Sequence, residues 1–131
     1  MRSISTNKHI SYVLMCFVFL GCQSKPTSTT FFPKDTIDLG AVSSGDSIDF
    51  VVDVKNPTDN EAKVADIRGT CGCIKVKNYP AVLKPSEAGT INATYYSKFD
   101  KKSAGPLYKS IVLRSDKKPF IHAIQVKVNV E

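Results

Sequence analysis

The stretch SIDFVVDVK, residues 47–55, alternates apolar and polar side chains. Neighbouring side chains of an extended chain point to opposite faces, so this alternation gives the segment one apolar face and one polar face. The apolar face carries Ile48, Phe50, Val52 and Val54. The other face carries Asp49, Asp53 and Lys55. The segment is therefore predicted to be a β-strand that buries one face.

The same period of two recurs along the chain, and the segments between its occurrences are rich in Pro, Gly, Asn and Asp, which favour turns. No segment shows a sustained helical period. Strands are predicted at residues 31–40, 47–55, 61–69, 74–78, 90–96, 105–115 and 121–130, with the first of them at a sheet edge. Seven short strands in about 100 residues predict an all-β fold, an immunoglobulin-like antiparallel β-sandwich.

The first 21 residues have the pattern of a secretory signal peptide. Arg2 and Lys8 precede an apolar run of about 12 residues, which is shorter than the ~20 residues that a membrane-spanning helix needs. The segment FLGC, residues 19–22, resembles the lipobox of bacterial lipoproteins, which predicts a lipid on Cys22. Residues 22–30 then form a polar tether and residues 31–131 the folded domain. The alternative is an ordinary secretory signal in which Cys22 has no role.

Composition and charge argue against several functional classes. Removal of the signal lowers the basic count from 18 to 16 against 12 acidic residues, which leaves a net charge of +4. The lysines of the expected turns, such as Lys98 and Lys117, are not interleaved with stacking aromatics, so no nucleic-acid partner is expected. No Gly-x-Ser-x-Gly elbow and no phosphate-binding glycine loop is present, and neither catalysis nor a cofactor is predicted.

The segment RGTCGCIKV, residues 68–76, contains the two cysteines that would remain as thiols after signal removal and lipidation. In a regular strand, Cys71 and Cys73 would lie on the face opposite Ile74 and Val76, so both sulfurs are expected to face solvent. Nearby Lys75 would lower the pKa of a thiol there and make it more reactive.

Three interpretations of Cys71 and Cys73 stay open. A disulfide between them would need the chain to bend at Gly72, because residues two apart in a strand are separated by about 6.6 Å; such a bridge would suit thiol exchange. Two thiolates could bind Cu(I) or Zn(II), although His122 is the only histidine left to join them and is expected to be a hydrogen-bonded residue at the sandwich rim. The third interpretation is two small side chains packed beside a turn.

Two further positions match a modification pattern. Asp-Thr-Ile at residues 35–37 and Asp-Ser-Ile at residues 46–48 are similar to the Asp-Ser/Thr-aliphatic sequence that some bacteria glycosylate on oxygen. Thr36 and Ser47 are therefore candidate O-glycosylation sites.

Three stretches of the chain are similar to segments of one protein family. They are VKNPTDNEAKVADIRGTCGCI (residues 54–74), LKPSEAGTI (83–91) and GPLYKSIVLRSD (105–116). Together they resemble the bacterial lipoproteins that carry domain of unknown function 1573, across about residues 32–130. Ser86 stands where that family usually has glycine, and Asp116 where it has asparagine. The resemblance implies an immunoglobulin-like module, and it implies no particular activity because the family has none that is settled.

These features together predict a lipid-anchored protein of the bacterial cell envelope that serves as a binding or assembly module. Gln23 is not the aspartate that retains some lipoproteins in the inner membrane, which favours the outer membrane, on either its periplasmic or its surface face. The partner would be an unknown envelope protein or glycan, bound at an edge strand or at the loops of one end. The alternative function is a thiol-redox or metal-handling accessory that uses Cys71 and Cys73.

The lipid anchor can be tested by substitution of its cysteine. Cys22→Ala should move the protein from the membrane fraction to the soluble fraction, because a polar tether without acyl chains has little affinity for a bilayer. Cys16→Ala is the matched control and should leave the protein on membranes, since Met15 is too large for the position before a processed cysteine. Fractionation followed by immunoblotting gives the readout, and membrane retention of Cys22→Ala would contradict the lipobox assignment.

Overall fold

The computed structural model of the protein describes residues 29–101 and 104–131. The predicted signal peptide, the lipidation residue Cys22 and most of the tether lie outside the described residues. Within the described ranges, no helix has the length and apolar character needed to cross a membrane.

The described residues form an all-β fold, as the alternation predicts, and they contain eight strands. The strands are β1 (Thr36–Val42), β2 (Ser47–Lys55), β3 (Ala62–Gly69), β4 (Ile74–Asn78), β5 (Val82–Leu83), β6 (Ala88–Tyr96), β7 (Leu107–Ser115) and β8 (Ile121–Val130). A single 3-10 turn, η1 (Ser97–Phe99), follows β6. Each of the seven predicted segments overlaps one strand. Only β5 was not predicted, because two residues are too few to show an alternation.

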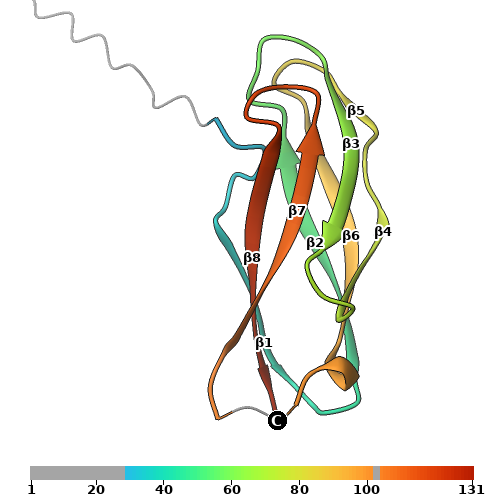
Figure 1. Ribbon diagram of the computed structural model, residues 1–131, viewed down its shortest axis with the longest axis vertical. Coiled ribbons are helices and arrows are strands. Elements are labelled where there is room, and N and C mark those ends of the chain that lie inside the picture. The colour runs from blue at the N-terminus through green and yellow to red at the C-terminus, as the bar shows by residue number, and fades with distance from the viewer. Residues whose placement is uncertain (1–28, 102–103) are drawn as a thin grey trace, which may run out of the picture.

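The strands form two sheets with the orders β1-β8-β7-β3-β5 and β2-β6-β4, and they run along the long axis of the molecule (Figure 1). The first strand lies at a sheet edge, as predicted. The predicted antiparallel sandwich is confirmed except at this edge, where β1 pairs with β8 in parallel, from Thr36 opposite Gln125 to Val42 opposite Val130. The two strands are far apart in sequence, so no hairpin forces them to be antiparallel.

The core lies between the inner faces of the two sheets. On β2, Val52 and Val54 are fully buried and Ile48 and Phe50 are partly buried, which confirms the predicted inward face. Strand β8 contributes a similar row to the opposite sheet: Ile124, Val126, Val128 and Val130. Each fully buried aliphatic side chain of this kind contributes about 1.5–3 kcal/mol relative to an exposed one, so these rows hold the sheets together.

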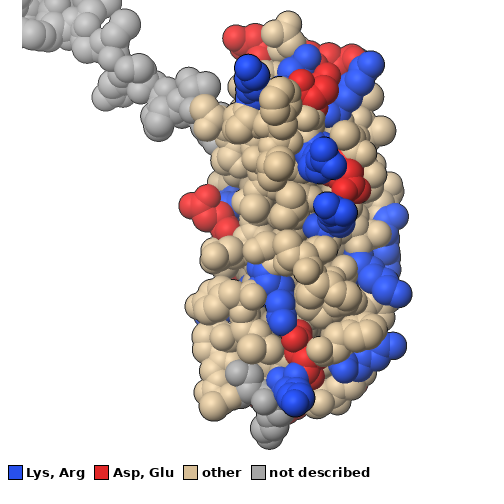
Figure 2. Space-filling model, in the orientation of Figure 1, with Lys and Arg blue, Asp and Glu red and all other residues tan. Residues whose placement is uncertain are grey.

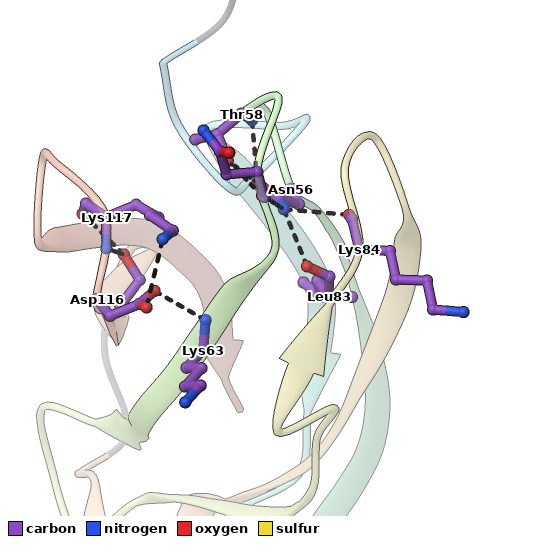
Figure 3. Close-up of polar contacts among 9 residues, drawn as sticks. Asn56, Thr58, Lys63, Leu83, Lys84, Asp116 and Lys117 are labelled. Atoms are coloured by element: carbon purple, nitrogen blue, oxygen red, sulfur yellow. Dashed lines mark hydrogen bonds and ion pairs between the residues drawn. The ribbon is translucent and has the colours of Figure 1, made fainter.

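At the end where the chain enters the domain, a fully buried amide joins two loops (Figure 3). The Asn56 Nδ2 group donates hydrogen bonds to the backbone carbonyls of Asn60 (2.8 Å), Leu83 (3.0 Å) and Lys84 (3.1 Å). Asn56 Oδ1 accepts hydrogen bonds from the Thr58 amide at 3.0 Å and the Thr58 hydroxyl at 2.8 Å. A single side chain therefore fixes the β2–β3 loop against the segment that leads from β5 to β6.

Two other polar contacts fix turns at the same end. Asp116 Oδ1 accepts a hydrogen bond from the Lys63 amide at 2.8 Å, and Lys117 Nζ lies 3.5 Å from Asp116 Oδ2 (Figure 3). The Lys63 hydrogen bond holds the pKa of the Asp116 carboxyl below its usual value.

In the turn before β6, Ser86 has a left-handed φ of 59°, at the position where the resembling family has glycine. Glycine adopts that conformation without the steric penalty that serine meets.

Replacement of the buried amide should weaken the fold. Asn56→Ala should lower the free energy of unfolding by about 3 kcal/mol, because it leaves buried carbonyls without donors. Asn60→Ala removes an exposed amide from the same loop and should change stability by less than about 0.5 kcal/mol. Urea unfolding of both variants measures the difference, and equal stabilities would show that the Asn56 hydrogen bonds are dispensable.

Candidate functional site

The turn at residues 70–73, called here the cysteine turn, carries the chain from β3 in the five-stranded sheet to β4 in the three-stranded sheet. Its first residue is held by β7, because the Thr70 amide donates to the Ser110 carbonyl at 2.9 Å. Its last residue is held by β6, because the Tyr96 amide donates to the Cys73 carbonyl at 2.7 Å. The turn is therefore fixed to both sheets.

A glycine before the turn allows the chain to double back. A Cβ atom on Gly69 would lie 2.7 Å from Ile74 Cβ and 2.8 Å from the Ile74 carbonyl oxygen, so β3 and β4 could not approach as they do with any other residue there. A Cβ atom on Gly72, the glycine on which the sequence analysis relied, would have no neighbour within 4 Å. Gly69 was overlooked because it ends a predicted strand and does not lie between the cysteines.

Cys71 and Cys73 form a disulfide across this turn, with their Cα atoms 5.1 Å apart. Cys73 is only 1% exposed and belongs to the core, whereas Cys71 is partly buried. The expectation that both sulfurs face solvent is therefore wrong for Cys73. The strand alternation on which it rested begins only at Ile74, and the turn before that residue brings the Cα atoms closer than the ~6.6 Å of a strand.

The bridge limits the chemistry that the two sulfurs can offer. Joined in a disulfide, they present no thiolate to a metal or an electrophile, and they react only with an incoming thiolate. Attack requires access, and the partly buried Cys71 is more open to it than Cys73, which is 1% exposed. Arg68, three residues before Cys71, lies with its guanidinium 3.6 Å from the Asp66 carboxylate on its own strand.

The described residues do not assemble a metal centre. Among residues 29–101 and 104–131, no group of three or more His, Cys, Asp or Glu side chains is placed to hold an ion. His122 is in register with Leu113 and its ring lies 4.7 Å from that of Phe31, so it packs away from the cysteine turn.

His122 itself is a buried, neutral residue. Burial lowers the pKa of its imidazole, and a hydrogen bond to the Pro119 backbone opposes that shift only partly. Its Nε2 atom is buried without a hydrogen-bond partner in the described part of the chain. The residue is hydrogen-bonded, as predicted, but it is sealed inside the end of the sandwich and does not line an open rim.

An aromatic–lysine cluster lies beyond the cysteine turn, formed by Tyr96, Phe99, Lys75 and Lys98. Lys75 Nζ and Lys98 Nζ lie 5.6 and 5.7 Å from the Tyr96 ring centre, and Lys98 Nζ also lies 5.1 Å from that of Phe99. Phe99 is 55% exposed. The expectation that the lysines lack stacking aromatics is wrong here: Lys98 lies between Tyr96 and Phe99 in the sequence, and folding adds Lys75 from β4.

Beneath the cluster, a polar chain supports η1. The Tyr95 hydroxyl donates to Asp100 Oδ2 at 2.6 Å, and Lys109 Nζ contacts Asp100 Oδ1 at 2.5 Å. Burial raises the pKa of Tyr95, and the hydrogen bond to Asp100 adds to the shift. The phenol therefore stays protonated and acts as a fixed donor that positions the segment after β6. No spacing in the sequence indicates that these three residues meet.

The two candidate glycosylation residues are both exposed. Thr36 is the first residue of β1 and Ser47 the first residue of β2.

Figure 2 shows that Lys and Arg side chains are spread along the visible face and are not gathered into one patch.

Comparison with known families identifies the domain. A family model described as "Protein of unknown function (DUF1573)" matches residues 30–130. The chain belongs to this family. The match covers every strand of the DUF1573 domain and includes the cysteine turn. No curated protein matches the chain.

Solved structures show that the DUF1573 domain has an immunoglobulin-like fold. A crystal structure of a protein of unknown function from Porphyromonas gingivalis W83 is similar at 12% identity and a TM-score of 0.61, over 72% of this chain and 44% of that one. The ASH/PapD-like domain 7 of human CEP192 matches at 10% identity and a TM-score of 0.56, over 82% and 92% of the two chains. The secreted serine protease VesC of Vibrio cholerae matches at 14% identity and a TM-score of 0.54, over 71% of this chain and 21% of the protease chain. At these identities the likeness concerns the fold alone.

The asymmetry of the disulfide predicts different reactivities for the two thiols once it is opened. Cys73→Ser leaves Cys71 as the free thiol, which should react rapidly with a water-soluble maleimide. Cys71→Ser leaves buried Cys73, whose labelling should be slower by on the order of tenfold or more because it requires local opening. Mass spectrometry follows the labelling kinetics, with denatured samples as the reference. Equal labelling rates of Cys71 and Cys73 in the two native variants would refute the asymmetry.

Proposed function

We propose that this DUF1573 domain is a binding or assembly module, held at the bacterial envelope by a lipid on Cys22, and that it is not an enzyme. The signal-like residues 1–21, the lipobox-like segment before Cys22 and the polar tether support the anchor and favour the outer membrane. The immunoglobulin-like fold supports the binding role, because such sandwiches carry recognition on their edges and end loops. No cofactor is part of this proposal.

The observation that carries the proposal is the position of the aromatic–lysine cluster. The described chain enters at one end of the sandwich, whereas η1, which carries Lys98 and Phe99, lies at the other end (Figure 1). A domain tethered through its N-terminus would therefore direct Phe99 and Lys98 away from the membrane. Exposed aromatic side chains are common anchors of protein interfaces, and the adjacent ammonium groups favour a partner with negative charge. An envelope protein or an anionic glycan has that character.

The disulfide supports a second candidate function, exchange with an external dithiol. Cys71 is only partly buried whereas Cys73 is 1% exposed, so a thiolate that attacks Cys71 would form a mixed disulfide there and release Cys73 as the leaving thiolate. A second thiol of the dithiol would then resolve the mixed disulfide and leave both protein cysteines reduced. This candidate uses the cysteine turn and leaves the aromatic–lysine cluster without a role.

The two candidates are separated by a pair of matched substitutions. Phe99→Ala should weaken the affinity of the full-length protein for its envelope partner by about tenfold, as expected for loss of a central interface aromatic. Phe120→Ala removes a phenylalanine of similar exposure, 52%, from the β7–β8 turn at the entry end and should leave the affinity within about twofold. The partner is first recovered by cross-linking in native cells, then purified for the titration.

Two results would overturn the binding proposal. One is that cross-linking yields no discrete partner. The other is that every adduct forms through Cys71 in the Cys73→Ser variant and is released by reductant, which would favour the dithiol-exchange function instead.

A further inference from the structure

Strand β2 is an edge strand whose outer side is unpaired over its central part. It pairs only with β6, from Ser47 opposite Tyr96 to Lys55 opposite Ala88. The Asn56 amide donates to the Glu87 carbonyl and continues this ladder, whereas the Lys55 amide points the other way and donates to the Phe31 carbonyl at 2.8 Å. Because backbone groups alternate sides along a strand, the even-numbered residues of β2 face β6 and the odd-numbered residues face the open edge.

The odd-numbered residues Asp49, Val51 and Asp53 therefore direct their amides and carbonyls outward. None of these backbone groups has a hydrogen-bond partner among the described residues. The edge is closed at one end, where the Lys55 amide donates to the Phe31 carbonyl at 2.8 Å. The open row from Asp49 to Asp53 spans about five residues, the length of an ordinary added strand.

Side chains around this row give it a specific character. Val51, at its centre, is 55% exposed. A groove on its inner side, between β1 and β2, includes Ile37 and Ile124 among its lining residues, with Asp53 and Lys34 also at its surface. A second depression lies on the outer face of the sheet, beside Val51 and Asn92. A strand laid along β2 would place alternate side chains over these two depressions.

The two carboxylates along the row, those of Asp49 and Asp53, differ in whether they already form an ion pair. Asp49 contacts Lys77 Nζ at 2.7 Å and accepts a hydrogen bond from the Thr94 hydroxyl at 2.5 Å. Lys77 and then Thr94 hold the pKa of the Asp49 carboxyl below its usual value. Asp53 has no ion pair within the described part of the chain, although Lys34 lines the same groove. The position opposite Asp53 is therefore suited to a cationic side chain.

We propose that β2 is the docking edge for an extended segment of a partner protein, which adds as a fourth strand beyond residues 49–53. The segment would place a basic residue opposite Asp53 and direct apolar side chains toward Ile37 and Ile124. The inference rests on the proposed binding function and specifies one partner class for it, a protein segment and not a glycan. Backbone pairing would supply affinity, and the alternating side chains would supply selectivity.

A second copy of this chain suits the edge less well. Antiparallel pairing of two β2 strands about Val51 would place Asp49 of one copy opposite Asp53 of the other, so two carboxylates would face each other. A shift of the pairing that brings Lys55 opposite Asp49 would need the Lys55 amide, which is already bonded to Phe31. A different chain with an alternating basic and apolar segment meets neither obstacle.

Amide hydrogen exchange of the full-length protein tests this docking edge directly. The probe is an end-blocked peptide, Ser-Lys-Val-Val-Val-Thr-Ser, which can place lysine opposite Asp53 in antiparallel pairing; the control peptide has glutamate in place of lysine. The lysine peptide should protect the amides of Asp49, Val51 and Asp53. The amides of Phe50 and Val52, which already face β6, should change little.

Two substitutions separate the backbone and charge contributions. Val51→Pro removes an outward amide without touching the β2–β6 ladder and should abolish protection by the peptide. Asp53→Asn should weaken peptide affinity by about threefold, the effect of one exposed ion pair. Val82→Lys, at an exposed apolar position of β5, is the control and should leave the affinity unchanged.

Three outcomes would overturn the inference. The first is that millimolar lysine peptide protects none of the three amides, and the second is that it protects the Asp49 and Asp53 amides equally well in Val51→Pro. The third is that the three amides become protected without peptide as protein concentration rises, which would assign the edge to a second copy. If instead the native partner binds and depends on Phe99 but not on Val51, the binding function stands and only its assignment to β2 fails.

Discussion

The burial of two apolar sheet faces against each other is the constraint on which the rest of this structure depends. It fixes which side of every strand points inward, and so determines that Val52 and Val54 enter the core while Asp49 and Asp53 stay outside. It also requires the chain to cross between sheets. The cysteine turn is one such crossing, and its hydrogen bonds to β6 and β7 explain why its geometry is closely fixed.

The period of two was sufficient to predict the fold class and all the longer strands, because a half-buried strand records its two faces in the order of its residues. Strand pairing was harder to predict from the sequence than the strands themselves. The parallel pairing of β1 with β8 depends on how strands distant in sequence are stacked, which local alternation does not encode. Strand β5 was missed because it is held by backbone pairing with β3 and carries no pattern of its own.

At the candidate site, the sequence drew attention to Cys71 and Cys73 but did not predict their environment. Extending the strand alternation back through Cys73 failed because the turn ends before Ile74, and Gly69, whose missing side chain makes room for Ile74, lies outside the motif that drew attention. The aromatic–lysine cluster was missed although Tyr96, Lys98 and Phe99 lie within four residues of the sequence. Tertiary packing adds Lys75 from β4 to this cluster and Lys109 from β7 to the Tyr95–Asp100 pair, and no local pattern indicates either contact.

The position of Phe31 determines how mechanical load would pass through the domain. Its carbonyl is bonded to Lys55 at the end of β2, and its ring packs against His122 at the start of β8. A pull on the chain ahead of Phe31 would therefore be shared at once between the two sheets and would not begin by peeling β1 from its neighbour. A partner bound along β2 would lie on the path of that force. Tension between the membrane anchor and the partner could therefore be transmitted through β2 without first unfolding the domain.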